Sequence, residues 1–181
     1  MNSSSAPSAS PYSFDKLALS PAALANLQRL GYVEMTAIQV ESLPPALEGK
    51  DVIAQAKTGS GKTAAFALAL LSKIDARDFS TQALVLCPTR ELADQVTTEI
   101  RRLARAEDNV KVVTLAGGVP LRGQTTSLER GAHVVVGTPG RVIDHLERGN
   151  LNLDVLTTLV LDEADRMLDM GFVDDIFKVA K

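Results

Sequence analysis

The clearest chemistry in the sequence lies in one small-residue loop, Gln55-Ala56-Lys57-Thr58-Gly59-Ser60-Gly61-Lys62-Thr63. This loop follows a short run at 51–54 and precedes a helical pattern at 64–71. A strand, a loop ending in Gly-Lys-Thr and a helix together form the context that a phosphate-binding loop needs. Backbone N–H groups and the positive end of the helix would converge there on anionic oxygens. We therefore predict a strand at 51–54 and a phosphate site at 56–63. The alternative is a glycine-rich turn with no chemical role.

Individual residues of the loop have separate predicted roles. Gly59 and Gly61 let the backbone approach a ligand closely and adopt conformations that a Cβ would hinder. Lys62 would supply a positive charge to the outer phosphates, and Thr63 would offer a hydroxyl to Mg²⁺. The general pattern of such loops begins with Gly, whereas this chain has Ala56 at that position.

A second chemical signature, Asp162-Glu163-Ala164-Asp165, directly follows the apolar run at 158–161. In a protein with a phosphate-binding loop, an acidic residue at the tip of a buried strand holds Mg²⁺ beside the outer phosphate. Asp162 is expected to position the metal, partly through water, and Glu163 to orient or deprotonate the attacking water. The alternative is that these carboxylates simply occupy the first turn of a helix, where acidic residues are common.

Alternating strand and helix patterns must position these groups. Apolar runs at 83–87, 111–115, 133–136 and 158–161 alternate with helical patterns at about 91–105, 121–129 and 140–148. A last helix is predicted to begin near Val173. Repeated β-then-α units with apolar strands predict an α/β fold, a parallel sheet with helices on both faces. Ligands of such sheets gather at the carboxyl ends of the strands.

The N-terminal part of the chain does not show this alternation of strand and helix patterns. Residues 1–12 are rich in Ser, Ala and Pro, which predicts a disordered tail. Ser20-Pro21 has the pattern of a helix start, with Ser as the cap and Pro at the first position. Thr36 is expected to cap a second helix that runs to Leu47, unless Pro44-Pro45 breaks it early.

Composition narrows the class of protein. The 181 residues are 45% hydrophobic and 23% charged, which fits one soluble globular domain. The net charge of −3 excludes bulk cationic attraction to nucleic acid, so any such binding needs a local patch. Cys87 is the only cysteine, which excludes an intrachain disulfide, and His133 and His145 lack metal-ligand spacing. Without a membrane-length apolar run or a secretion signal, a cytoplasmic protein is expected, with no membrane partner.

These motifs together resemble the DEAD-box RNA helicases. Asp162-Glu163-Ala164-Asp165 spells the signature of that family, and the loop at 56–63 is the family's own version, which also lacks the first Gly. Further stretches resemble the remaining motifs in order and extend the resemblance over residues 14–181. They are Phe14, Gly31-Tyr32 and Thr36-Ala37-Ile38-Gln39 for the Q motif, Pro88-Thr89-Arg90-Glu91-Leu92 for motif Ia, Gly117-Gly118 for the GG motif and Thr138-Pro139-Gly140-Arg141 for motif Ib.

The resemblance implies a RecA-like P-loop NTPase domain at 13–181, incomplete at its C-terminus, with ATP and Mg²⁺ as cofactors. It implies that Phe14, Tyr32, Thr36 and Gln39 hold the adenine, with Phe14 stacked on the base. The alternative for Phe14 is a hydrophobic anchor for the tail. Lys62, Asp162 and Glu163 would be catalytic, and Thr63 and Asp162 would hold the metal. The implied RNA-backbone contacts are Pro88, Thr89, Arg90, Gly117, Gly118, Thr138, Pro139, Gly140 and Arg141. Without the family, a helix start and simple turns explain these residues.

The sequence is especially similar to one bacterial family member, which adds ribosomal RNA as a candidate partner of an expected monomer. Two hypotheses compete with the assignment as an RNA helicase. One is another P-loop ATPase, such as a DNA helicase or transporter motor, and the other is a non-enzymatic fragment that binds nucleotide or RNA. The family's Ser-Ala-Thr motif and second domain are not found in this sequence. The resemblance therefore implies slow hydrolysis and no unwinding by these residues alone. It also implies that the strands at 51–54 and 158–161 are not direct neighbours.

Overall fold

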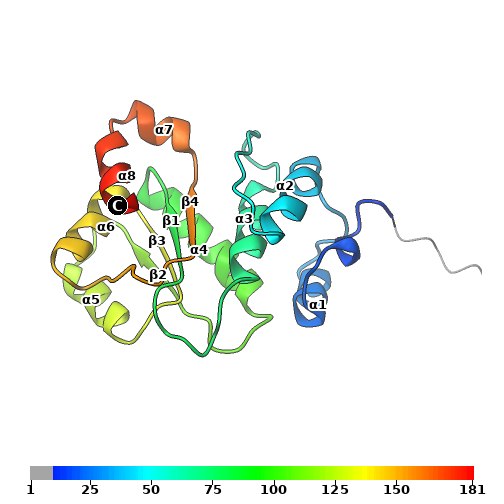
Figure 1. Ribbon diagram of the computed structural model, residues 1–181, viewed down its shortest axis with the longest axis horizontal. Coiled ribbons are helices and arrows are strands. Elements are labelled where there is room, and N and C mark those ends of the chain that lie inside the picture. Colours follow the sequence, from blue (N-terminus) through cyan, green and yellow to red (C-terminus); the bar gives the residue numbers. More distant parts are fainter. Residues whose placement is uncertain (1–9) are drawn as a thin grey trace, which may run out of the picture. The chain divides into compact units, whose positions relative to one another are not determined.

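The computed structural model describes residues 10–181, which form two compact units divided between Ser72 and Lys73 (Figure 1). Most of the predicted disordered tail, residues 1–9, lies outside the described residues. Within residues 10–181, no helix combines the length and apolar character needed to cross a membrane.

The first unit is helical. It contains a 3-10 turn η1 (Phe14–Lys16) and helices α1 (Pro21–Arg29), α2 (Ala37–Leu47) and α3 (Lys62–Leu71). The predicted start of α1 is confirmed, because the Ser20 hydroxyl accepts a hydrogen bond from the Ala23 N–H at 3.1 Å. Helix α2 starts after Thr36 as predicted and continues through both prolines, so the early break that Pro44-Pro45 suggested does not occur.

The predicted strand at Asp51–Ala54 is wrong. This segment has no regular secondary structure, and its Ile53 side chain is fully exposed. A β-strand is stabilised by backbone hydrogen bonds to a neighbouring strand, so an apolar run without such a partner stays irregular. Although the loop and helix that follow match the prediction, the strand that was expected to lead into them is absent.

The second unit is an α/β sandwich that follows the predicted alternation (Figure 1). Its elements are β1 (Ala83–Leu86), α4 (Arg90–Ala104), β2 (Val112–Leu115), α5 (Leu121–Glu129), β3 (Val134–Gly137), α6 (Pro139–Glu147), β4 (Thr158–Leu161), α7 (Ala164–Asp169) and α8 (Val173–Ala180). The strands form one parallel sheet in the order β2-β3-β1-β4. The predicted α/β fold is confirmed.

Strand register brings the carboxyl ends of all four strands to one edge of the sheet. Leu86 of β1 is aligned with Gly137 of β3 and with Leu161 of β4, and Gly137 is aligned with Leu115 of β2. The loops that follow these strands therefore start at the same level. Among the described residues, β4 pairs with β1 alone and forms one edge of the sheet.

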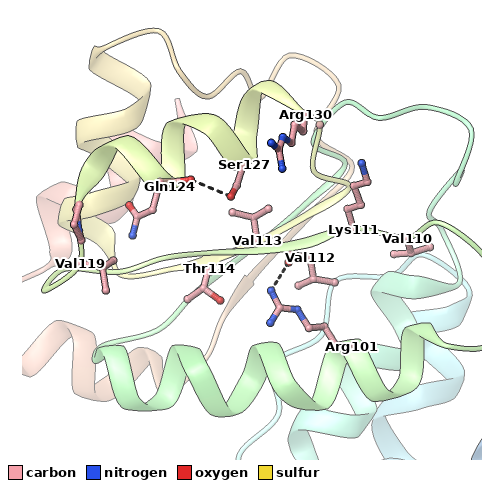
Figure 2. Close-up of a pocket in the computed structure, with 13 residues that line it drawn as sticks. Arg101, Val110, Lys111, Val112, Val113, Thr114, Val119, Gln124, Ser127 and Arg130 are labelled. Atoms are coloured by element: carbon pink, nitrogen blue, oxygen red, sulfur yellow. Dashed lines mark hydrogen bonds between the residues drawn. The ribbon is translucent and has the colours of Figure 1, made fainter.

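Helices cover both faces of this sheet. Figure 2 shows α4 and α5 on opposite sides of β2. The apolar core on the α5, α6 and α8 side is built on fully buried strand residues, Leu84 and Leu86 among them, and it includes Met167 of α7 and Val179 of α8. On the other side α4 buries Val96, Ile100 and Leu103, whose spacing places them on one side of the helix.

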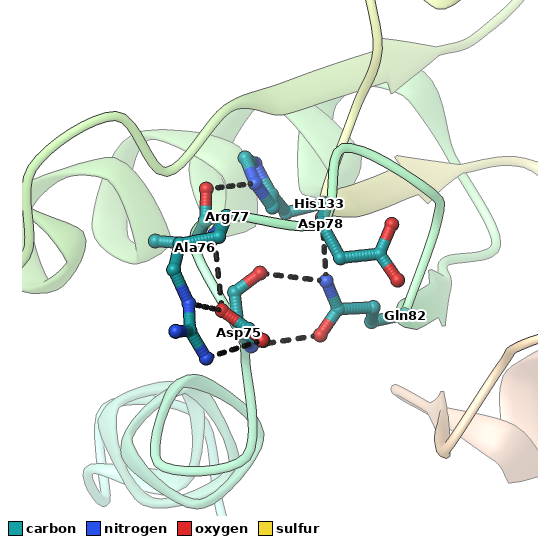
Figure 3. A network of polar contacts seen from close by, with 6 residues as sticks. All are labelled: Asp75, Ala76, Arg77, Asp78, Gln82 and His133. Carbon is teal, nitrogen blue, oxygen red and sulfur yellow. Dashed lines mark hydrogen bonds and ion pairs between the residues drawn. The ribbon is translucent and has the colours of Figure 1, made fainter.

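A polar network fixes the start of β3 (Figure 3). His133 Nδ1 accepts the Lys111 N–H at 2.9 Å, and His133 Nε2 lies 3.0 Å from the Ala76 carbonyl oxygen. The side chain of Gln82 bonds the backbone of Asp75 at both its oxygen and its nitrogen. Buried polar groups with such partners stabilise a unique loop conformation, so His133 has a structural role.

Candidate functional site

The predicted phosphate loop has the backbone conformation that such a site needs. Gly59 and Gly61 both adopt left-handed conformations, with φ of +80° and +89°. Hydrogen bonding within α3 begins with the Ala65 N–H, which donates to the Gly61 carbonyl at 3.1 Å. The N–H groups of the first helical residues therefore precede the helix's own ladder and are open to an anionic ligand.

One hydroxyl in this loop lacks a partner. The Ser60 Oγ is buried, and within the described chain no group forms a hydrogen bond with it. A buried polar atom without a partner is rare in folded proteins and often marks a place for a ligand. A phosphate oxygen would satisfy this hydroxyl, so the loop fits the predicted phosphate group.

Gln39 connects α2 to the phosphate loop. Its side-chain oxygen accepts the Thr36 N–H at 2.9 Å, and its side-chain nitrogen donates to the Gly61 carbonyl at 3.1 Å. The side chain is 1% exposed. Each of its two polar atoms thus already has one protein partner, and the amide orientation is set by Thr36 and Gly61.

The other two residues predicted to hold the adenine lie in the same unit. Phe14 is buried and meets the ring of Tyr32 edge-on, with ring centroids 6.3 Å apart. This packing anchors the turn at Phe14–Lys16 to the residues after α1. It fits the alternative in which Phe14 is a hydrophobic anchor for the tail. A base would reach the partly buried Tyr32 more easily than Phe14.

The acidic signature lies at the carboxyl end of β4, in the second unit. Asp162 continues the ladder for one residue, because its N–H donates to the Leu86 carbonyl at 3.0 Å, and its side chain is 8% exposed. Glu163 then adopts a left-handed conformation, with φ of +51°. Such a conformation is strained for a residue with a Cβ, and strained residues cluster at functional sites. Its carboxylate accepts a hydrogen bond from Arg166 at 3.3 Å.

Cys87 sits next to this acidic turn. Burial raises the pKa of the Cys87 thiol, and the nearby Asp162 and Glu163 raise it further. A thiol held in its protonated form is a poor nucleophile. Cys87 is therefore the small core residue that its place on an apolar strand suggests.

The predicted RNA-binding residues lie in the loops after β1, β2 and β3 and in the first turns of α4 and α6. Thr89 caps α4, because its hydroxyl accepts the Leu92 N–H at 3.3 Å. Arg90 lies beside Gly118, so closely that a Cβ at Gly118 would be 2.7 Å from the Arg90 guanidinium. The residues of motifs Ia and GG thus meet at one edge of the sheet, where their backbone and guanidinium donors could hold phosphates.

The loop after β3 joins the same edge. The Thr138 N–H donates to the Leu115 carbonyl at 3.0 Å, and Pro139 opens helix α6. Arg141 Nη1 donates to the Val119 carbonyl at 3.1 Å and to Gln124 Oε1 at 3.0 Å. Gln124 has no counterpart among the predicted site residues. A single Gln within a helix pattern gives no sequence signal for such a contact.

The donor set for a metal is small. Within the part of the chain that the structure describes, no three His, Cys, Asp or Glu side chains gather to form a cation site. Mg²⁺ is usually bound by one or two carboxylates together with phosphates and waters, so it needs no such cluster. The buried carboxylate of Asp162 and the hydroxyl of Thr63 are hard oxygen donors of the right kind.

A basic groove that sequence analysis did not predict runs along the outer edge of β2 (Figure 2). Its volume is about 770 Å³, and its charged lining residues are all cationic: Arg101, Lys111 and Arg130. Arg101 donates to the Val112 carbonyl at 2.8 Å and so covers part of the strand's open edge. The groove reaches Val119 and Gln124, next to the strand-end loops.

The sequence of this chain is similar to the sequences of known RNA helicases. The chain is 61% identical over 165 residues to the ATP-dependent RNA helicase DbpA of Escherichia coli and 47% identical over 163 residues to the DEAD-box ATP-dependent RNA helicase CshA of Geobacillus kaustophilus. These alignments cover 90% of this chain but only 36% and 35% of those proteins. The chain therefore spans about a third of the length of the curated relatives it matches.

A solved structure shows the same fold. The crystal structure of a DEAD box protein from Methanococcus jannaschii matches with a TM-score of 0.88 and 41% identity, over 93% of this chain and 46% of that one. This likeness confirms the predicted RecA-like domain. The family model described as DEAD/DEAH box helicase matches residues 36–181, from the capping residue of α2 through the acidic signature to the last residue. The chain belongs to the DEAD/DEAH box helicase family.

Proposed function

We propose that this chain binds ATP with Mg²⁺ at the loop 56–63 and the backbone of RNA at the loops after β1, β2 and β3. The observation that carries the ATP proposal is the loop's own geometry. Two left-handed glycines lead into the open N-terminus of α3, beside the buried Ser60 hydroxyl without a partner. This arrangement suits the phosphates of a nucleotide, and Lys62 at the first position of α3 would neutralise their outer charge.

The metal is proposed to be held by Thr63 and Asp162, the latter partly through water. Bound there, it would neutralise charge on the phosphates as they react. Asp162 directly follows β4, and its N–H bond to the Leu86 carbonyl fixes its backbone. The backbone that carries the carboxylate is therefore in place before a ligand arrives.

Glu163 is proposed to orient the attacking water or to take its proton. The left-handed turn at Glu163 places this residue directly after Asp162 and before α7. Its contact with Arg166 is a single long hydrogen bond at a partly exposed position, so the carboxylate can exchange that partner for a water. General bases of this kind contribute about 10²–10⁴-fold to a rate.

RNA is proposed to be held through its phosphates and sugars. Hydroxyl, guanidinium and backbone N–H donors from three loops share one sheet edge, and such contacts carry no base preference. The local cations Arg90 and Arg141 supply the patch that the net charge of −3 requires. Ribosomal RNA is a candidate through the similarity to DbpA.

For the full-length protein we propose the activity named in its relatives, that of an ATP-dependent RNA helicase of the cytoplasm. In this family the second domain is expected to bring the arginine residues that touch the γ-phosphate, and an arginine supplied in this way is worth about 10³–10⁵ in phosphoryl-transfer rate. Residues 1–181 by themselves are therefore expected to hydrolyse ATP slowly. The second candidate is a fragment that binds nucleotide or RNA without turnover, and hydrolysis measured with and without RNA separates the two.

The metal assignment is tested by Asp162→Asn. This change removes the charge of the buried carboxylate with little change in shape. In Mg²⁺ the affinity for ATP is expected to fall by about tenfold or more, the size of a lost contact to a charged group. In EDTA the affinity is expected to match that of the unchanged chain. Titrations of a fluorescent ATP analogue in the two buffers measure both values.

Asp169→Asn is the matched control, because Asp169 is an exposed carboxylate at the end of α7. It should bind the analogue as the unchanged chain does in both buffers. An Asp162→Asn chain whose affinity responds to Mg²⁺ in the same way as the control would show that Asp162 does not hold the metal.

A further inference from the structure

Gln124 lies where two of the strand-end loops meet. It projects from α5 near Val119 (Figure 2), and its side chain is only 7% exposed. Its nitrogen Nε2 donates to the Ala116 carbonyl at 2.9 Å, directly before the Gly117-Gly118 turn. Its oxygen Oε1 accepts from Arg141 Nη1 at 3.0 Å. One amide thus connects the loop after β2 to the first turn of α6.

The surroundings allow only one orientation of this amide. Arg141 carries donors alone, and the Ala116 carbonyl is an acceptor alone. Rotating the amide by half a turn would place NH₂ against the guanidinium and oxygen against the carbonyl. In a buried site each such mismatch leaves a polar group unpaired, which is costly. The Gln124 oxygen must therefore face Arg141.

His145 on α6 supports the same oxygen. It is fully buried, and its Nε2 lies 2.9 Å from Gln124 Oε1. Since Oε1 can only accept, His145 Nε2 must carry the proton, which leaves Nδ1 to accept from Asn150 Nδ2 at 3.2 Å. Burial and the charge of Arg141 lower the pKa of His145, in keeping with this neutral form.

We propose that Gln124 is a positioning residue for the RNA interface, one that holds the Arg141 guanidinium and the turn at 116–119 in a fixed arrangement, with His145 as its support. The proposal rests on the RNA-binding function proposed above. Arg141 uses Nη1 for both of its contacts, to Val119 and Gln124. Its remaining donors, on Nε and Nη2, are the ones that would bind a phosphate oxygen pair.

The first test compares RNA binding by Gln124→Leu and the unchanged chain. Leucine fills a similar volume but cannot hold Arg141 or the Ala116 carbonyl. The affinity for a fluorescein-labelled oligouridine is expected to fall by about threefold to tenfold, because the released Arg141 side chain must be ordered when RNA binds. The affinity for ATP is expected to stay unchanged. Gln95→Leu, the same change at an exposed position of α4, is expected to alter neither.

A double-mutant cycle then shows whether Gln124 acts through Arg141. If it does, Gln124→Leu should cost little further RNA affinity in a chain that already carries Arg141→Ala. Equal losses in the two backgrounds would overturn the proposal.

Gln124→Glu keeps an acceptor for Arg141 and His145 and should bind RNA more tightly than Gln124→Leu. If Gln124→Leu fails to fold, the comparison of Gln124→Glu with the unchanged chain replaces it, and an affinity reduced as far as in Arg141→Ala would overturn the proposal.

A spectroscopic readout separates this proposal from RNA binding itself. In a ¹⁵N-labelled chain, the Arg141 Nε–Hε signal is expected to be sharp, and the His145 ring nitrogens are expected to show the Nε2-protonated form. Gln124→Leu should broaden the Arg141 signal, whereas Gln95→Leu should leave it sharp. If the chain binds no RNA but the Arg141 signal still broadens in Gln124→Leu and not in Gln95→Leu, only the proposed RNA binding is contradicted. A sharp Arg141 signal in Gln124→Leu would contradict the positioning role.

Discussion

Gly61→Ala is expected to destabilise the phosphate loop by about 2–5 kcal/mol and to abolish most ATP binding. Two costs add. The left-handed backbone at Gly61, with φ of +89°, costs a residue with a Cβ about 1–2 kcal/mol. The new Cβ would also lie 2.6 Å from Gln39 Nε2 and 2.8 Å from Thr36 Oγ1, and such overpacking costs about 1–3 kcal/mol. Urea unfolding of the chain and titration with an ATP analogue measure the two effects.

Gly59→Ala separates these two costs. Gly59 has a similar φ of +80°, but nothing lies within 4 Å of the Cβ that alanine would add. It should therefore lose only the backbone contribution. Gln39→Ala in the Gly61→Ala chain removes the atom of closest approach and should recover part of the lost stability. A Gly61→Ala chain no less stable than Gly59→Ala would contradict the packing of Gln39 against the loop.

Leu84→Ala is expected to cost about 2–5 kcal/mol of unfolding free energy in the second unit. Leu84 of β1 is fully buried and belongs to the main core cluster, so truncating it loses transfer energy and leaves a cavity. Thermal and urea unfolding followed by circular dichroism measure the loss.

Leu159→Ala is the matched control for this change. Leu159 is the partner of Leu84 in the register between β1 and β4, but it is 38% exposed on the edge strand. Because its side chain is only partly removed from water, alanine there is expected to cost about 1 kcal/mol. Equal losses at the two positions would mean that the face of β4 that carries Leu159 is buried in solution.

Much of the second unit followed from the sequence. Apolar runs such as 83–87 contain strands because a strand covered by helices must be apolar along its length. Helix α5 occupies 121–129 as predicted. The wrong prediction at 51–54 has a physical cause. An apolar run indicates that a segment tends to be buried, but it does not show whether a partner strand is present.

The candidate site was predictable at the level of motifs. Glycines that free the backbone, followed by Lys62 and Thr63, and the carboxylates at 162–165 are recognisable by residue type and spacing alone. Contacts between distant residues were not predictable, because they depend on tertiary packing. The bond from Gln39 to Gly61 and the role of Gln124 beside Arg141 emerged only from the structure. The left-handed turn at Glu163 likewise leaves no trace in sequence pattern.

The central claim is that nucleotide phosphates bind at the N-terminus of α3, next to Lys62. Calorimetric titration of the chain with ATP and Mg²⁺ tests it most directly when Lys62→Ala is compared with Lys73→Ala, which removes an exposed lysine just outside the helix. A lost charge-assisted contact of about 1.5–3 kcal/mol predicts an ATP affinity about 10–100-fold weaker for Lys62→Ala and unchanged for Lys73→Ala. Equal affinities in both variants would contradict the phosphate site.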